Sequence, residues 1–430
     1  MRTSMSALGM ALIILLSGSC RKEELVQEMP VSGVKVHPIY TVHVGRLPQG
    51  GYLLQCVDDP IYHRLDFAQL MSADGELLQK IDYAPIRAAY STDPDKEFYI
   101  TDIVPMGPDR YAVIGYGIEV TDTGYPTDLV IHQVNTNGEQ VAEVIERPLG
   151  SIGTTEHESF LYPTYKERAI GVRTPNGDLV VALNMGLYNG PGTHVLKLYR
   201  FPLSGPPSTE RAISFTGPYD TQGSFMWSLQ LSTTEPDKVL LLQSDYYLFN
   251  TLRKLAFTPT AIIEEEVDRP SFPFVFRPYV FLQDVDGTYA FGGNRVDGGQ
   301  VLSGFFPQIQ QGACESALYQ QYQFPPGYGN TPFQCYAGAF WNGKLALLTS
   351  AYEAGVIQPY FPGDRESDLG LMLISPVDNT VTDYRTLVPG QGMRGIALFN
   401  DGGQLVVIGT NYPYENTSLH HTFFMRVKND

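Results

Sequence analysis

The sequence predicts an all-β protein assembled from repeated units, and three observations lead to this fold class. Seven segments share one layout, in which an apolar stretch, a turn of Gly, Asp, Asn or Pro and a second apolar stretch follow one another; LQDVDGTYAFGG at residues 282–293 is an example. No segment shows the long 3.6-residue periodicity of an amphipathic helix. The residues that directly follow the seven turns recur at intervals of 50 to 68 residues; they are Tyr52, Tyr111, Leu179, Val239, Tyr289, Leu345 and Leu405. Strands and Gly-rich hairpins at such intervals are typical of the blades of a β-propeller.

Each copy is followed by further strand candidates, as four-stranded blades require. In the second copy these candidates span residues 128–135 and 139–146, and in the sixth copy 369–375 and 380–387. The third and fourth copies fit this pattern less cleanly. We expect one large propeller domain over residues 34–430, because repeats can extend a domain without a second core.

The two ends of the repeat region complete each other. Only residues 421–428 follow the last copy, which is therefore one strand short, whereas apolar-alternating residues 34–39 precede the first inner strand at 40–44. Pairing the N-terminal strand with the last blade would close the ring and remove two open sheet edges. Ring closure predicts seven blades, and the faintness of the repeats leaves six or eight open.

Composition excludes one class of partner. The 430 residues include 46 acidic and 29 basic side chains, which gives a net charge of −17. Such a surface repels the phosphates of nucleic acids and the head groups of anionic membranes. The acidity is typical of a charge that keeps an extracytoplasmic protein soluble, and an acidic binding site is the alternative.

The N-terminus predicts export. Arg2 precedes a short apolar run and the small residues Ser17, Gly18 and Ser19, which lead to Cys20. The apolar run is too short to span a bilayer and indicates a signal peptide. The series resembles a bacterial lipobox, which implies a lipoprotein signal over residues 1–19, acylation of Cys20 and a flexible tether over 20–33. Ser17 departs from the Leu that is usual in this pattern, and an ordinary secretory signal is the alternative.

The residues after Cys20 indicate where the exported protein is sent. Residues 21–24, Arg-Lys-Glu-Glu, resemble the tags that direct some lipoproteins to the outer face of the outer membrane. A solvated tether is the alternative. We expect an outer-membrane lipoprotein that faces the periplasm or the cell surface, held to the membrane by its N-terminal lipid.

Three cysteines remain. Cys56 lies in an apolar strand, where a lone thiol usually acts as a small hydrophobic residue. Cys314 and Cys335 flank an irregular stretch, and an oxidising compartment would permit a disulfide between them. The repeat alignment argues against that bridge, because it places Cys314 at the start of an outer strand and Cys335 at the start of an inner one.

The candidate binding residues are loop tyrosines. In a propeller the connections from second to third strands, and from each blade to the next, open on one face, and here these connections are long. Loops on a rigid scaffold commonly carry function, and tyrosine rings can stack on a sugar or a peptide. Packing between loops is the alternative role. The candidates are Tyr116, Tyr125, Tyr188, Tyr219, Tyr247, Tyr352, Tyr360, Tyr412 and Tyr414.

Catalytic and metal-binding signals are weak. Asp284 and Asp286 begin like a calcium loop, but no later carboxylate follows, so these residues indicate a hairpin turn. The local motifs of hydrolase, zinc-protease, nucleotide and redox sites are missing from the sequence, and we expect no metal or cofactor. Glu156, Glu158 and Asp364 are candidate acids for a glycoside hydrolase or lyase.

Over residues 34–430 the repeats resemble kelch-like and related bacterial propeller repeats, which implies a fold and leaves the activity open. The leading hypothesis is a lipid-anchored propeller that binds a glycan or peptide through its loop face, alongside an outer-membrane uptake system. A protein-interaction scaffold for an envelope complex is the second hypothesis. An enzyme is the third and the least favoured.

Overall fold

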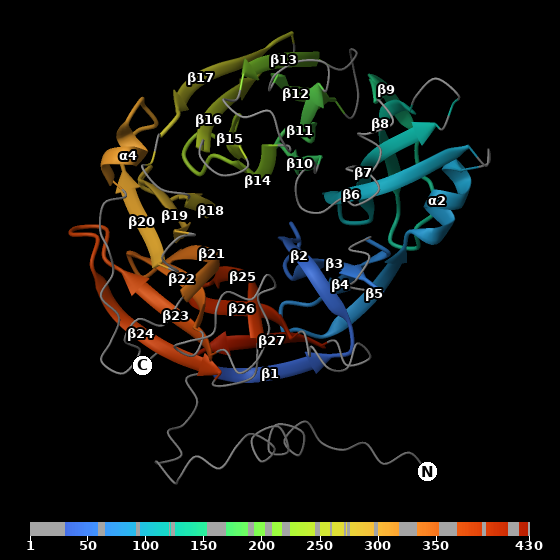
Figure 1. The fold of residues 1–430 in the computed structure, drawn as a ribbon. Coiled ribbons are helices and arrows are strands. Elements are labelled where there is room, and N and C mark those ends of the chain that lie inside the picture. The colour runs from blue at the N-terminus through green and yellow to red at the C-terminus, as the bar shows by residue number, and fades with distance from the viewer. Residues whose placement is uncertain are drawn as a thin grey trace, which may run out of the picture.

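Seven antiparallel sheets stand around a common centre in the computed structural model (Figure 1). The structure describes residues 31–58, 65–91, 95–119, 121, 125–152, 169–187, 193–202, 209–216, 224–245, 250–258, 260–270, 272, 276–295, 300–317, 333–351, 368–388, 393–411 and 421–428. The predicted β-propeller of seven blades is therefore confirmed, and counts of six and eight are excluded.

We number the blades 1 to 7 by their innermost strands, which are β2, β6, β10, β14, β18, β21 and β25. Blade 1 consists of β2 (Tyr40–Arg46), β3 (Tyr52–Val57), β4 (Phe67–Met71) and β5 (Leu77–Asp82). Blade 2 consists of β6 (Lys96–Gly107), β7 (Arg110–Glu119), β8 (Tyr125–Val134) and β9 (Ile145–Ile152). Blade 3 consists of β10 (Ile170–Arg173), β11 (Leu179–Leu187), β12 (Thr193–Phe201) and β13 (Thr209–Thr216).

The remaining blades complete the ring. Blade 4 consists of β14 (Ser224–Leu231), β15 (Lys238–Asp245), β16 (Asn250–Phe257) and β17 (Ile262–Asp268). Blade 5 has three strands in the described part of the chain, β18 (Phe276–Gln283), β19 (Tyr289–Arg295) and β20 (Gln300–Phe306). Blade 6 consists of β21 (Phe333–Trp341), β22 (Lys344–Ala351), β23 (Asp368–Ile374) and β24 (Val381–Val388). Blade 7 consists of β25 (Met393–Asp401), β26 (Gln404–Asn411), β27 (His421–Val427) and β1 (Val31–His37).

Two short helices accompany the blades in the described residues, α2 (Ala84–Tyr90) and α4 (Ala313–Ala317). Within that part of the chain, no helix is long and apolar enough to cross a membrane. Helix α4 lies against β20 on the outer side of blade 5, where a Cβ placed on Gly304 would be 2.8 Å from the backbone of Ala317. Asn379, from the turn between β23 and β24, donates through Nδ2 to Ser303 O at 3.0 Å. The helix and this amide therefore cover part of the outer edge of β20, which limits edge-to-edge association.

Strand β1 closes the ring as the outermost strand of blade 7, so the predicted N-terminal closure is confirmed. It pairs antiparallel with β27, from Val31 opposite Val427 to His37 opposite Thr422. Because the strand begins at Val31, the last three residues of the predicted 20–33 tether belong to the blade.

The same strand also contacts blade 1. His37 Nε2 donates to Gly75 O at 2.8 Å, and Lys35 forms an ion pair with Glu76, both in the turn between β4 and β5. Strand β1 is thus held in blade 7 by backbone pairing with β27, and its side chains contact blade 1.

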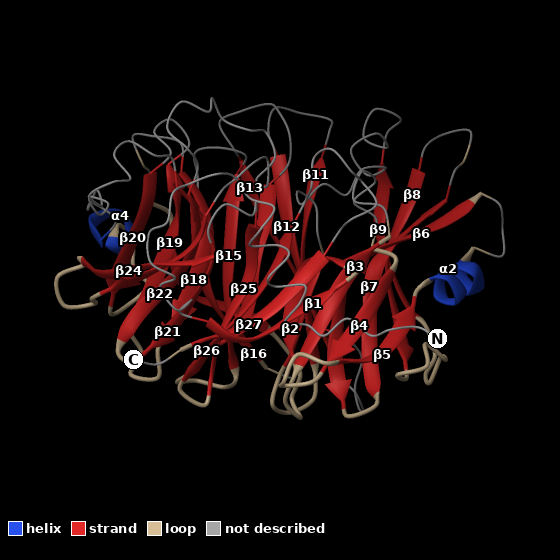
Figure 2. Cartoon of the chain, turned by 90° about the horizontal axis from the view of Figure 1, so that it is seen from below, coloured by secondary structure: helices blue, strands red, loops and turns tan. Residues whose placement is uncertain are grey.

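The ring has two distinct faces. The turns that join first to second strands and third to fourth strands, such as residues 284–288 and 72–76, lie on one face, and Figure 2 shows such turns in tan along one side. We call this the hairpin face. The opposite loop face is where second strands end and where first and third strands begin.

The turn at residues 284–288 confirms the hairpin interpretation of its aspartates. Gly287 N donates to Asp284 O at 3.1 Å, and Gly287 has φ +93°, a conformation that glycine adopts without steric cost. Asp286 accepts a hydrogen bond from Thr288 N at 2.8 Å, which lowers the pKa of the Asp286 carboxyl. Both aspartates therefore stabilise a turn.

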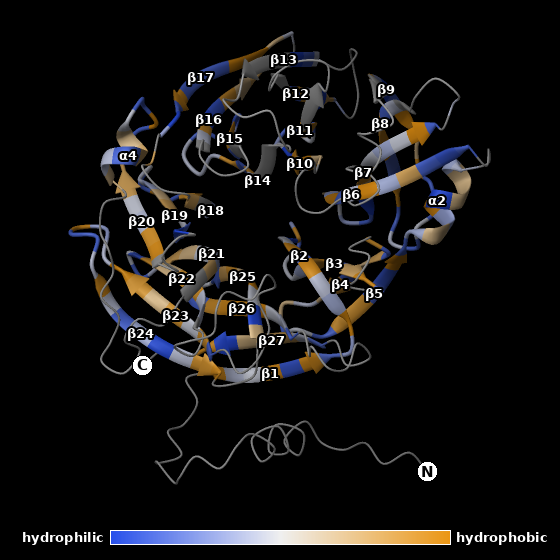
Figure 3. Cartoon of the chain, viewed as in Figure 1, coloured by the Kyte–Doolittle hydropathy of each residue, from blue (hydrophilic) through white to orange (hydrophobic). Residues whose placement is uncertain are grey.

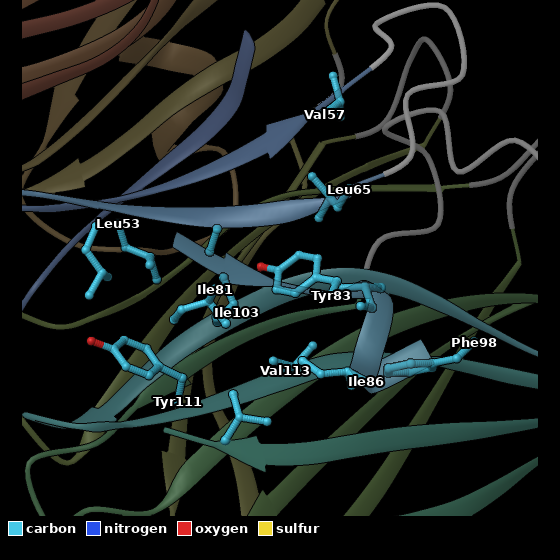
Figure 4. Packing of buried hydrophobic residues seen from close by; sticks show 14 of the residues in the cluster. Leu53, Val57, Leu65, Ile81, Tyr83, Ile86, Phe98, Ile103, Tyr111 and Val113 are labelled. Carbon is cyan, nitrogen blue, oxygen red and sulfur yellow. The ribbon is translucent and has the colours of Figure 1, made fainter. Parts of the chain in front are cut away.

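Apolar side chains fill the space between neighbouring blades. Between blades 1 and 2, Leu53 and Ile81 pack with Ile103, Tyr111 and Val113 (Figure 4). Outer strands are more polar, as the hydrophilic stretches of β17 and β24 show (Figure 3). The hydrophobic core is thus a series of layers between blades.

Strand β8 carries a buried histidine in one of these layers. His132 is 3% exposed, and its ring lies 5.1 Å from that of Phe98 and 6.3 Å from that of Tyr90 between centroids. Its Nε2 has no hydrogen-bond partner within the described residues. Burial lowers the pKa of His132 to about 4, because an apolar environment disfavours the charged ring.

Candidate functional site

The innermost strands share a structural irregularity that positions side chains around the centre. In six blades, one residue of the innermost strand is left out of the ladder to the second strand, while the second strand continues without a gap. This is the arrangement of a β-bulge, which can re-aim a side chain. The unpaired residues are Val42, Thr101, Trp227, Tyr279, Tyr336 and Ile396. We call these six residues the rim.

The bulges lie at one height in the ring. In each of these six blades, the residue that follows the bulge pairs with the same position of the second strand. This position is three residues after the first residue of that strand's apolar stretch; in blade 5 the stretch starts at Tyr289, and Val280 pairs with Gly292. In blade 3, Ile170 pairs with Ala182 at this same position, and Ile170 is where β10 begins. The rim therefore marks one level that runs around the centre.

That level belongs to the loop face. Tyr279 is the fourth residue of β18 and Tyr336 the fourth of β21, and innermost strands run from the loop face towards the hairpin face. The rim thus lies near the middle of the innermost strands, in the half that is closer to the loop face. This is the face on which the sequence predicts ligand binding.

The rim is chemically asymmetric. Three successive blades carry aromatic residues at the bulge, namely Trp227, Tyr279 and Tyr336, whereas Ile396 and Val42 follow in blades 7 and 1. The rings of Tyr279 and Tyr336 meet edge to face, with centroids 5.5 Å apart and an interplanar angle of 64°. Both tyrosines are partly exposed. For Trp227 the structure describes the backbone position.

An arginine extends the aromatic pair into blade 7. The Arg394 guanidinium lies over the ring of Tyr336, with Cζ 4.6 Å from the ring centroid. Arg394 stands two residues before the bulge on β25 and pairs with Thr410. Arg277 occupies the same register position on β18, opposite Asn294. Three consecutive innermost strands therefore bring together two tyrosines and a guanidinium.

Glycines make room for the bulged backbone. A Cβ at Gly115 would lie 2.1 Å from Tyr99 O, and a Cβ at Gly409 would lie 2.8 Å from Arg394 O. Both glycines sit on second strands, opposite the residue that precedes the bulge. A larger residue at position 409 would displace the backbone that carries Arg394.

Polar side chains from one blade hold the start of the next innermost strand. Asn294 accepts from Cys335 N at 2.8 Å and donates to Cys335 O at 3.3 Å, which fixes the residue next to Tyr336. Ser350 Oγ donates to Met393 O at 3.1 Å, next to Arg394. Tyr336 and Arg394 therefore stand on a backbone that is tied to the preceding blade, as a preorganised site requires.

A buried carboxylate beside the bulge of blade 2 has a structural role. Asp102 is 5% exposed and accepts hydrogen bonds from Gln55 Nε2 at 2.5 Å, Ile103 N at 2.9 Å and Gly171 N at 2.9 Å. These donors come from blades 1, 2 and 3. Asp102 therefore joins three blades, and its oxygens are engaged in that contact. Within the described residues, no group of three or more His, Cys, Asp or Glu side chains is placed to hold a metal ion.

The predicted binding role of Tyr116 is wrong. The sequence places Tyr116 at the edge of a loop, but β7 continues to Glu119, and Tyr116 is 3% exposed in the layer between blades 2 and 3. Its ring is therefore part of the hydrophobic core. Tyr125 begins β8, and of this residue the structure describes the backbone.

The other predicted functional residues fall on parts of the chain that the structure leaves undescribed. They are Tyr188, Tyr219, Tyr247, Tyr352, Tyr360, Tyr412 and Tyr414, the candidate acids Glu156, Glu158 and Asp364, and the lipidation residue Cys20. Their predicted roles remain predictions.

The considered disulfide between Cys314 and Cys335 is not formed. Both thiols are free and buried, in different clusters: Cys314 on α4 packs with Phe276 and Phe306, and Cys335 on β21 packs with Val280. Burial raises the pKa of Cys314 well above its ordinary value and that of Cys335 to about 12, so neither thiol forms a reactive thiolate near neutral pH.

Sequence reasoning did not find the site itself. Tyr279, Tyr336 and Arg394 lie within predicted strands, where an aromatic residue is ordinarily assigned to the core. Aligning the innermost strands by their bulges, instead of the repeats by their turns, places the aromatic residues of blades 4 to 6 in one column.

Comparisons with known proteins assign no family to the chain. No protein-family model matches the chain, and no curated protein matches it, so the resemblance to kelch-like repeats stays a prediction. Among solved structures, the phage phi92 endosialidase is similar over 94% of this chain and 70% of its own, with 9% identity and a TM-score of 0.45. For the Trypanosoma rangeli sialidase the values are 85%, 58%, 9% and 0.32. For the WD40 domain of SCAP from fission yeast they are 95%, 90%, 9% and 0.34. These likenesses contribute nothing to the assignment of a site.

Proposed function

We propose that the protein is a lipid-anchored β-propeller of the cell envelope that binds a glycan at the rim of its loop face. The contact between Tyr279 and Tyr336, partly exposed on adjacent innermost strands, carries this proposal. The rim offers ring surface for the apolar faces of sugar rings, and the Arg394 guanidinium beside it supplies hydrogen-bond donors.

The construction of the site favours binding over a purely structural role for these side chains. Tyr52, Tyr111 and Tyr199 are aromatic residues of the layers between blades that are completely buried. Tyr279 and Tyr336, in contrast, keep part of their surface exposed at bulges, where side chains are commonly re-aimed. A peptide is the alternative ligand, and turnover of a bound glycan would indicate the enzyme hypothesis.

The direction of β1 supports the proposed anchor. Val31 pairs with Val427 at the end of β27, and the neighbouring Arg426 pairs with Val406, close to the turn between β25 and β26 on the hairpin face. Strand β1 therefore begins at the hairpin face. An anchor at Cys20 would hold that face towards the membrane and leave the loop face open to ligand.

Acylation is tested directly at Cys20. We expect wild-type protein expressed in a Gram-negative host to incorporate radiolabelled palmitate and to sediment with outer membranes, whereas Cys20→Ser should incorporate none and appear in the soluble fraction. Because the substitution replaces only the acylated atom, the propeller should keep its thermal unfolding midpoint. Equal labelling of both proteins would contradict the proposed anchor.

Glycan binding is tested with ring-removing and ring-preserving substitutions. We expect Tyr336→Ala to weaken binding to the best ligand of a glycan array about tenfold, since an aromatic contact of roughly 1.4 kcal/mol corresponds to that factor. Tyr336→Phe keeps the ring and should stay within about twofold of wild type. Isothermal titration calorimetry gives the affinities, and thermal melting checks that both variants are folded.

Two results would overturn this function. Binding to a peptide library by a wild-type protein that binds no glycan would assign a peptide ligand. Unchanged glycan affinity in folded Tyr279→Ala and Tyr336→Ala proteins would move the site away from the rim. Chromatography of the glycan after incubation detects turnover.

A further inference from the structure

We infer that the glycan bound at the rim is acidic, and that Arg394 selects it by pairing with a carboxylate. This inference rests on the proposed function and names the ligand class of the same site. Arg394 is a cation that lies beside the partly exposed Tyr279 and Tyr336.

The geometry suits this role. The guanidinium of Arg394 lies over the ring of Tyr336, with Cζ 4.6 Å from the ring centroid. A guanidinium can contact an aromatic ring with its flat face while its N–H groups, which lie in its plane, bind a carboxylate in a bidentate arrangement. Because Nε of Arg394 is buried, its terminal N–H groups are the ones that would meet a carboxylate. A sugar that packs on the tyrosines would therefore bring a ring carboxylate within reach of those donors.

The register of the strands strengthens the argument. Arg394 in blade 7 and Arg277 in blade 5 occupy equivalent positions two residues before the bulge, and β21 with Tyr336 lies between their strands. Two basic residues thus stand at one level on either side of a blade whose bulge residue is aromatic.

Net charge makes this placement informative. The chain carries −17 overall, so an acidic glycan is repelled at long range by the protein as a whole. Recognition of such a ligand requires a local cation at the point of contact, and Arg394 provides it at the rim. A neutral glycan would need no such charge.

A matched control exists in the same ring. Arg46, on innermost strand β2, also lies over an aromatic ring, with Cζ 5.8 Å from the centroid of Phe399 on the neighbouring blade. Arg46 ends β2 near the hairpin face and pairs with Asp401 at 3.2 Å. Arg46→Gln therefore removes a cation that also lies over an aromatic ring, at the hairpin-face end of an innermost strand.

The experiment compares acidic sugars with neutral sugars of the same rings. The probes are oligogalacturonates and sialylated oligosaccharides on an array, each beside its carboxyl-reduced counterpart, followed by calorimetry on the best pair. Wild type should prefer the acidic member at least tenfold. Arg394→Gln should lose that preference while its affinity for the neutral member changes less than twofold, and Arg46→Gln should behave as wild type.

The outcomes separate this inference from the proposed function. Equal binding of acidic and neutral members by wild type, with Tyr336→Ala still weakening both, would overturn the acidic ligand and keep glycan binding. If Tyr336→Ala keeps the wild-type glycan affinity and Arg394→Gln keeps the wild-type preference for the acidic member, both the proposed function and this inference would be overturned. If thermal melting shows that Arg394→Gln is unfolded, Arg394→Lys preserves the charge without the planar fork, and a reduced but measurable acidic preference in that variant supports the inference. An unchanged preference in folded Arg394→Lys and Arg394→Gln would contradict it.

Discussion

A chain without residues 31–37 is expected to lose the closed ring and most of its stability. Deletion of β1 exposes the outer edge of β27 and removes Val31, Val34 and Val36 from the layer between blades 6 and 7. Full burial of a valine side chain contributes about 1.5–3 kcal/mol. Val31 is buried and Val34 and Val36 are partly buried, so the three together contribute roughly 3–6 kcal/mol before any hydrogen bond is counted. Net stabilities of proteins lie at about 5–15 kcal/mol, so this loss is a large fraction of the total.

Urea denaturation and light scattering after size-exclusion chromatography measure this effect. The deleted chain should unfold at a much lower urea concentration and form aggregates through the open edge of β27. Deletion of residues 24–30, the same length of chain taken from the predicted tether, is the control and should leave the midpoint in place. A peptide VSGVKVH added in trans should restore part of the stability. A monomeric β1-deleted protein with the wild-type midpoint would show that closure does not depend on this strand.

Acid is expected to destabilise the protein through His132 at a pH where carboxylates are still ionised. The pKa of His132 is about 4 in the folded protein and near 6.5 in an unfolded chain. Between these values unfolding takes up a proton, so the free energy of unfolding falls as the pH falls. The contribution is fully present above pH 6.5 and lost below about pH 4, and it amounts to roughly 3 kcal/mol.

Denaturation curves at several pH values isolate this contribution. His132→Phe removes the titrating group and suits the packing against Phe98 and Tyr90. Its free energy of unfolding should decline less than that of wild type between pH 7 and 4, with the difference near 3 kcal/mol. His421→Gln, which removes a partly exposed imidazole, should leave the wild-type decline in place. Parallel curves for wild type and His132→Phe would refute the assignment.

Local patterning accounts for most of the fold. The sixth copy predicted strands at 369–375 and 380–387, and the structure has Asp368–Ile374 and Val381–Val388, because alternation and turn residues determine both strands. The second copy predicted 139–146, whereas β9 begins at Ile145. Gln140 forms only an isolated bridge with Val134. The continuous ladder with β8 begins at Ile145, and the local sequence does not show where this ladder begins.

Interactions between distant residues explain the errors. Cys314 was expected on an outer strand, but it lies in α4, where Asp268 accepts hydrogen bonds from Gly312 N at 2.8 Å and Cys314 N at 2.7 Å. This carboxylate is 44 residues from the first of these donors, so no local sequence pattern predicts the contact. The rim was missed for a related reason, because a bulge is defined by the pairing of two strands.

The bulges also set a few positions of the innermost strands apart from the ladder of hydrogen-bonded pairs. A one-residue slip in a sheet moves every side chain to the opposite face, so residues within the ladder are constrained by their partners. Rim residues stand outside the ladder, and Val, Thr, Trp, Tyr and Ile all occur there in one molecule. On the proposed function, ligand preference would change by substitution at the partly exposed rim residues, whereas Thr101 is buried and donates to Ala169 O at 2.9 Å, so that position also holds blades 2 and 3 together.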